Sequence, residues 1–111
     1  MDLNGFLCAA RACPEAVQSG HNHMMDFRVR KKVFATYDPK LDLAGLNLLP
    51  EQQAHLMACS DAFFPANGIW GERGWTKITL GAADDETVRD AVMMAWAKTA
   101  PISLVKARQS S

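Results

Sequence analysis

GIWGERGWTKITL, residues 68–80, is the stretch of sequence that decides the fold. It holds two of the chain's three tryptophans and three of its seven glycines. Its end alternates between apolar and polar residues, which predicts a half-buried strand at about residues 74–80. Successive side chains of a strand point to opposite faces, so we expect Ile78 and Leu80 to face the core. The opposite face, which we expect to be in contact with solvent, then carries Trp75, Lys77 and Thr79.

The segments on either side of this stretch predict more strands and three helices. Apolar residues at helical spacing, with proline or acidic residues at the helix starts, predict helices over residues 3–12, 50–59 and about 84–99. Residues 26–37 are rich in β-formers and predict a hairpin. Its turn lacks the usual glycine or asparagine, so we expect a lysine at positive φ. Further expectations are a short strand at 16–18, a turn at 19–23, a strand with a bulge at Gly45 over 41–49, and a frayed basic tail over 102–111.

The order of these elements indicates the fold class. Strands joined by hairpin-length links imply an antiparallel sheet, and helices at both ends with one inserted imply helices packed on one face. We therefore predict one α+β domain over residues 1–111, a two-layer sandwich of an antiparallel sheet with helices packed on one of its faces.

Composition narrows the functional classes. The chain has 111 residues, 49% of them hydrophobic, and a formal net charge of zero, so binding to nucleic acid would require a local basic patch. An odd count of three cysteines favours a reducing compartment without disulfides. No signal peptide and no stretch of about 20 apolar residues is visible, so we expect a cytoplasmic protein with no membrane partner. We expect a monomer, because no apolar stripe is left over.

Several ordered blocks of the sequence resemble the MmcQ/YjbR family. The first block is DFRVRKKVFAT, residues 26–36, and the second is PEQQ, residues 50–53. The third is GIWGERGWT, residues 68–76, and the last combines Ala95-Trp96 with Ala100-Pro101. The chain departs from the family pattern at Lys31, where glycine is common in the turn, and at Ile102, where a lysine often follows the proline.

The resemblance implies a CyaY-like fold, related to that of frataxin, and DNA binding through a double-wing arrangement. It supplies no catalytic residues. Frataxin relatives also suggest iron binding through an acidic ridge, but only Asp2 and Glu15 flank the first helix here, so we do not carry that role over.

The residues themselves offer a basic hairpin as a candidate DNA-binding site. Cationic side chains neutralise phosphates, and a protruding ribbon can enter a groove. Aromatic side chains can stack on splayed bases. The candidate contacts are Arg28, Arg30, Lys31, Lys32, Arg73, Trp75 and Lys77. Two alternatives stay open: a solvated turn whose lysines protect a sheet edge, and a module that binds a protein or a small ligand on the Trp75 face.

For the remaining candidate sites we expect a structural role rather than a functional one. We expect Trp70 to cover the edge of the core, with Gly71 and Gly74 shaping the backbone beneath it. His21 and His23 are interpreted as exposed loop residues without a metal, since no compact ligand spacing is present. The three cysteines, Cys8, Cys13 and Cys59, are interpreted as small buried hydrophobes. With no phosphate loop, dinucleotide fingerprint or nucleophile elbow, we expect neither an enzyme nor a cofactor.

Overall fold

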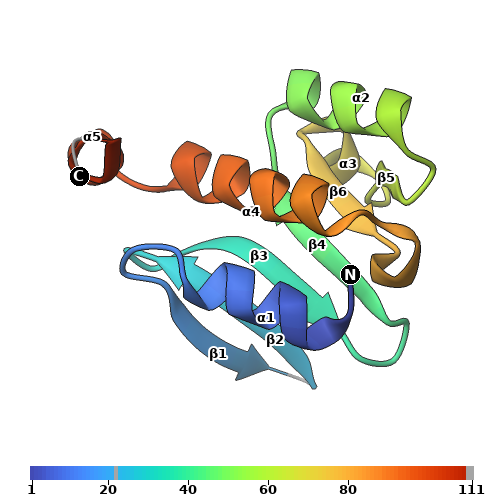
Figure 1. The fold of residues 1–111 in the computed structure, drawn as a ribbon, viewed down its shortest axis with the longest axis horizontal. Helices are drawn as coiled ribbons and strands as arrows, with labels where there is room; N and C mark the ends of the chain where they lie inside the picture. The colour runs from blue at the N-terminus through green and yellow to red at the C-terminus, as the bar shows by residue number, and fades with distance from the viewer. Residues whose placement is uncertain (22, 110–111) are drawn as a thin grey trace.

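The computed structural model describes residues 1–21 and 23–109. Within this part of the chain, six strands form one antiparallel sheet in the order β1-β2-β3-β4-β6-β5 (Figure 1). The strands are β1 (Val17–His21), β2 (Met24–Val29), β3 (Lys32–Asp38), β4 (Leu43–Asn47), β5 (Phe63–Pro65) and β6 (Trp75–Ile78). The predicted α+β class with an antiparallel sheet is confirmed.

The helices of the described residues are α1 (Leu3–Arg11), α2 (Pro50–Cys59), α3 (Ile69–Glu72), α4 (Asp85–Thr99) and α5 (Ile102–Gln109), with a 3-10 turn, η1 (Leu80–Ala82). Figure 1 shows α1 and α4 side by side over one face of the sheet, and α5 set off beyond the end of α4. Helix α2 packs against β5 and β6. None of these helices has the length and apolar character that crossing a bilayer requires.

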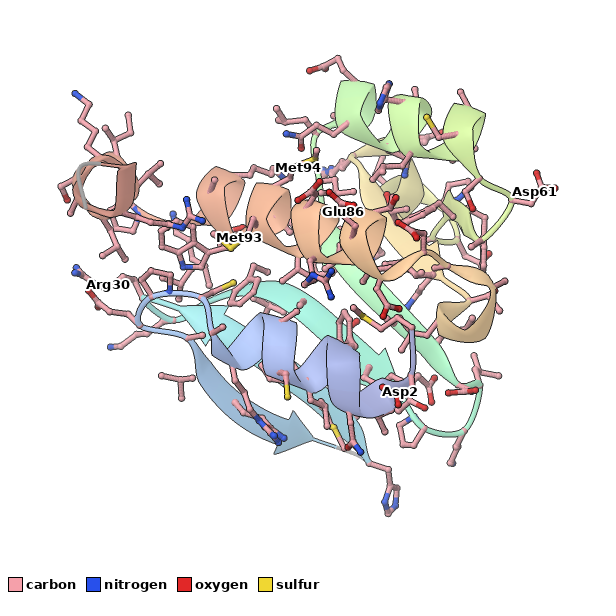
Figure 2. The ribbon with its side chains drawn as sticks, in the orientation of Figure 1. Asp2, Arg30, Asp61, Glu86, Met93 and Met94 are labelled. Atoms are coloured by element: carbon pink, nitrogen blue, oxygen red, sulfur yellow. The ribbon has the colours of Figure 1, made fainter. Side chains whose placement is uncertain are left out.

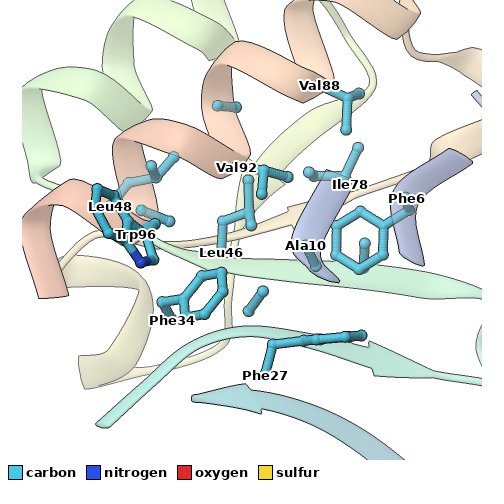
Figure 3. Packing of buried hydrophobic residues seen from close by; sticks show 14 of the residues in the cluster. Phe6, Ala10, Phe27, Phe34, Leu46, Leu48, Ile78, Val88, Val92 and Trp96 are labelled. Atoms are coloured by element: carbon cyan, nitrogen blue, oxygen red, sulfur yellow. The ribbon is translucent and has the colours of Figure 1, made fainter. Parts of the chain in front are cut away.

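The core lies between the sheet and the helices α1 and α4 (Figure 3). Helix α4 is capped by Asp84, whose carboxylate accepts a hydrogen bond from the Thr87 backbone N–H at 3.1 Å. This capping bond lowers the pKa of Asp84. The helix then buries the predicted stripe of Val88, Ala91, Val92, Ala95 and Trp96. These side chains pack with Phe6, Phe27, Phe34 and Leu46 from α1 and the strands.

The β2–β3 hairpin makes the positive-φ turn that the sequence predicts. Both of its turn residues, Arg30 at φ 49° and Lys31 at φ 72°, adopt the left-handed region. A two-residue turn of this kind matches the twist of the flanking strands. The register shifts between Phe27 and Arg28, leaving Phe34 as the extra residue of β3. As a result Phe34 and Ala35 are both fully buried.

Three predicted elements differ from the structure. Gly45 pairs regularly with Thr36 and Lys77, so the bulge expected there was wrong, and the irregularity lies at Phe27/Arg28 instead. Strand β1 extends to His21, beyond the expected end at 18; of the turn expected at 19–23, residue 22 lies outside the described residues. The tail forms a helix through Gln109 because Leu104 and Val105 pack against the core; residues 110–111 of that expectation are likewise outside the described part.

Candidate nucleic-acid interface

The basic hairpin lies at one end of the sheet, and two of its four cations are engaged by acids. Arg30 donates to both carboxylate oxygens of Glu15, with donor–acceptor distances of 2.6 and 3.0 Å. Figure 2 shows Arg30 at the outer end of the turn. Its hydrogen bonds lower the pKa of Glu15 and raise that of Arg30. Arg28 contacts Asp26 at 3.3 Å and also donates to the Lys31 carbonyl. A phosphate would therefore have to compete with these carboxylates for both arginines.

The two lysines of the hairpin are available for anions. Within the described part of the chain, no acid lies within ion-pair distance of the Lys31 or Lys32 ammonium. Both residues are exposed. The hairpin thus offers two cations to a phosphate backbone, where its sequence suggested four.

The opposite face of the sheet carries the second candidate surface, which we call the open face. Side chains that alternate with the core residues of β2, β3, β4 and β6 point to it. Ile78 and Leu80 are buried on the core side, as predicted, and Trp75 and Lys77 are half-buried on the open side. The prediction that Trp75 and Lys77 lie on the face opposite Ile78 and Leu80 is confirmed.

A groove of about 540 Å³ is hollowed into the open face. This volume lies within the usual range for ligand-binding clefts. Its lining includes Met24, Asp26, Thr36, Trp70, Trp75 and Lys77. The walls are mainly apolar, and the charged side chains are one carboxylate and one ammonium. The groove therefore combines two indoles with one cation on the face of the sheet that is not packed against the core.

The sequence interpretation of Trp70 was wrong. The side chain does not cover the core edge: Trp70 is 57% exposed and lines the groove. The Arg73 guanidinium carbon lies 5.7 Å from the centre of its ring, a cation–π contact. Sequence reasoning missed the short helix α3 over residues 69–72, and Trp70 of this helix lines the same groove as Trp75. Arg73 thus lies beside an indole that lines the groove.

A glutamine of helix α2 holds the groove wall in place. The Gln53 side-chain amide donates to the carbonyl oxygens of Gly71, at 3.1 Å, and of Trp75, at 3.0 Å. The preceding Gln52 accepts from the Leu49 backbone N–H at 3.0 Å and secures the start of α2. Two residues of the PEQQ block therefore act structurally, and one of them fixes the backbone that carries Trp75.

No reactive constellation lies in the groove. Its lining residues include neither histidine nor cysteine, and its carboxylate, Asp26, is held by Arg28. A cysteine–histidine pair does occur on exposed positions of α2, where Cys59 Sγ and His55 Nε2 are 3.8 Å apart. No third side chain orients this pair within the described residues. Among those residues, no group of three His, Cys, Asp or Glu side chains could hold a metal.

The cysteines divide into two classes, which corrects the prediction that all three are buried. Cys8 and Cys59 are exposed, because their positions on α1 and α2 face away from the core. Cys13 is 3% exposed and lies 3.6 Å from the Met93 sulfur of α4 (Met93 is labelled in Figure 2). Burial raises the pKa of the Cys13 thiol to about 11.

We expect two thiols to react rapidly with an aromatic disulfide reagent in the native protein and the third only after unfolding. The reason is that the thiolate is the nucleophile, and Cys13 is both buried and neutral at ordinary pH. Time-resolved absorbance counts the reacting thiols, with a Cys8→Ser/Cys59→Ser variant as control. Three thiols reacting at one rate would contradict the placement of Cys13.

Comparisons with known proteins agree with this fold. The model of the YjbR family matches residues 11–98. The crystal structure of Deinococcus radiodurans protein DR2400, with the family-model domain DUF419, is similar to this chain with a TM-score of 0.69 and 17% sequence identity. The match covers 82% of this chain and 72% of that one. Because the sequence identity is low, the match supports the fold alone. No curated protein matches this sequence.

Proposed function

We propose that this chain, which belongs to the MmcQ/YjbR family, is a non-enzymatic protein that binds single-stranded DNA across the open face of its sheet. The observation that carries the proposal is that Trp70, Trp75 and Lys77 line one groove. Bases of a single strand are unpaired and can stack on indoles, whereas those of a duplex cannot. We place DNA here because the family resemblance implies it.

Charge supports the open face as the main contact surface. With a net charge of zero, the protein cannot rely on long-range attraction to phosphates. Stacking then has to supply much of the affinity, at about 1–3 kcal/mol per base. In this proposal four cations add contacts to the phosphates of the bound strand: Lys31, Lys32, Arg73 and Lys77. Arg28 and Arg30 contribute less in this proposal, since each holds a carboxylate.

The same proposal includes a monomer in the cytoplasm that needs no cofactor and contacts no membrane. The odd number of cysteines supports a reducing compartment. The competing function is a module that binds a protein or a small ligand on the Trp75 face without nucleic acid. The groove suits that function too, so the experiment has to separate the two.

The test is a titration of a labelled single strand of about eight nucleotides, within the site sizes known for single-strand binders. Four phosphate contacts predict a log–log salt slope of about −3 for a single strand. Trp75→Ala should cost about 1–3 kcal/mol of binding free energy. Ile102→Ala, which removes an exposed apolar side chain from α5, should leave the affinity unchanged. Absence of binding at micromolar protein and low salt would exclude the DNA function.

Glu15→Gln tests the part played by the hairpin. Removing this carboxylate releases Arg30, which then becomes a further cation for the strand. We expect tighter binding and a salt slope steeper by about 0.7. Glu51→Gln on α2 is the matched control, because Glu51 is exposed and has no ion pair within the described residues. An unchanged slope in Glu15→Gln would remove the hairpin from the contact surface.

A further inference from the structure

One row of paired residues crosses all six strands, and three of its members, Asp26, Thr36 and Lys77, line the groove. The paired residues are Ser19, Asp26, Thr36, Gly45, Lys77 and Phe64, in the order of the strands. Partners that lie opposite each other in an antiparallel sheet point to the same face. The row therefore brings Asp26, from β2, and Lys77, from β6, onto one surface.

Gly45 lets Lys77 lie across the middle of this row. A Cβ atom at Gly45 would lie 2.5 Å from Thr36 Oγ1 and 3.6 Å from Lys77 Nζ. The Lys77 ammonium thus lies over Gly45 of β4, the neighbouring strand, rather than pointing straight away from the sheet. Within the described residues it has no hydrogen bond or ion pair. A half-buried ammonium without a partner is suited to an anionic ligand.

Asp26 places a fixed acceptor at the other end of the groove. Its side chain is 17% exposed, and the contact with Arg28 uses the Oδ2 oxygen. The Oδ1 oxygen has no partner among the described residues. Strands lie about 4.8 Å apart, so the ammonium above β4 and the carboxylate on β2 are separated by roughly 10 Å. This separation is comparable with the span from the amino group of a base to its phosphate.

We infer that the groove is a subsite for one unpaired nucleotide whose base carries an exocyclic amino group. The base packs against Trp75 and Trp70, the phosphate pairs with Lys77, and the amino group donates to Asp26. Carboxylates accept from the amino group of cytosine in this way. Uracil has a carbonyl oxygen at the same position, which the Asp26 carboxylate would repel. The inference rests on the proposed function and adds to it a preference between bases.

The test compares single strands of oligo-dC and oligo-dU of equal length. These bases have the same size and differ at the position that faces Asp26 in the inferred complex. We expect oligo-dC to bind at least about fivefold more tightly. Asp26→Asn should bring the ratio of the two affinities close to one. Because this variant also releases Arg28, the ratio is the readout rather than either affinity alone.

Two control variants act on the opposite side of the sheet, on helix α4. Asp90→Asn removes an exposed carboxylate and should preserve the ratio. Lys77→Gln should weaken both oligonucleotides, whereas Arg89→Ala, which removes an exposed cation from α4, should weaken neither. Thermal unfolding of each variant establishes that it is folded before its affinity is compared.

The outcomes separate this inference from the function on which it rests. A protein that binds both strands equally, or whose preference survives Asp26→Asn, overturns the inference and leaves single-strand binding intact. A protein that binds neither strand overturns both. Competition by free dCMP distinguishes the two sources of the ligand: displacement identifies a site for free nucleotides, and binding of the strand alone identifies an unpaired base within DNA.

Discussion

Gly74→Ala is expected to destabilise the protein by about 3 kcal/mol or more. Gly74 has φ 112°, a backbone conformation that residues with a Cβ rarely adopt. A Cβ built there would lie 1.9 Å from the Leu48 carbonyl oxygen. The obstacle is backbone rather than a mobile side chain, so β4 and β6 would have to separate. This separation would also break the hydrogen bond that the Leu48 N–H donates to the Gly74 carbonyl at 3.3 Å.

Gly81→Ala is the matched control for this prediction. A Cβ at Gly81 meets nothing within 4 Å, and the residue lies in the 3-10 turn η1. Its free energy of unfolding should change by no more than about 0.5 kcal/mol. Urea denaturation of both variants gives the comparison. Equal stabilities would mean that Gly74 does not approach the Leu48 backbone as described.

Trp96→Ala should cost about 3–5 kcal/mol of unfolding free energy. Trp96 is fully buried in the core between α4 and the sheet. Its indole N–H also donates to the Pro14 carbonyl at 2.9 Å, which ties α4 to the link between α1 and β1. The variant would leave a cavity and an unpaired carbonyl group.

Trp70→Ala provides the comparison within the same residue type. Because Trp70 is 57% exposed, its removal should cost no more than about 1 kcal/mol. Chemical denaturation monitored by circular dichroism measures both variants without depending on tryptophan fluorescence. A large loss in Trp70→Ala, or a small one in Trp96→Ala, would contradict the assignment of the two indoles to the groove and to the core.

Regular periodicity made most of the fold predictable. The stripe on α4 repeats apolar residues at helical spacing, and the structure buries those residues. Pro50 marks the start of α2, and alternation around Ile78 assigns the two faces of β6. Each of these features is determined by residues close together in the sequence and by which of them are apolar. They can therefore be predicted without knowing which distant segments pack together.

Contacts between distant segments were not predictable in the same way. Glu15 neutralises Arg30 because the link between α1 and β1 passes beside the hairpin turn, and only the folded chain brings these two segments together. Trp70 is exposed because α3 reverses the chain before β6, although a tryptophan between glycines is compatible with either placement. The exposed positions of Cys8 and Cys59 reflect which side of each helix meets the core.

The site was predictable in part. Trp75 and Lys77 follow from alternation along one strand, but Asp26 joins them only through the register of three successive strand pairings. Gly45 looked like a bulge because glycine commonly marks one in a strand. Its actual role is to leave room for Thr36 and Lys77, which no single segment of sequence encodes.

The most direct test of the account follows the three indole N–H signals in a heteronuclear NMR spectrum during titration with oligo-dC. Trp96 is buried and hydrogen-bonded to Pro14, so its signal is an internal control. If the open face binds the strand, the Trp75 and Trp70 signals shift saturably while the Trp96 signal stays in place. Shifts confined to the backbone amides of Arg30 and Lys31, with all three indole signals unmoved, would contradict the claim that the open face binds the strand.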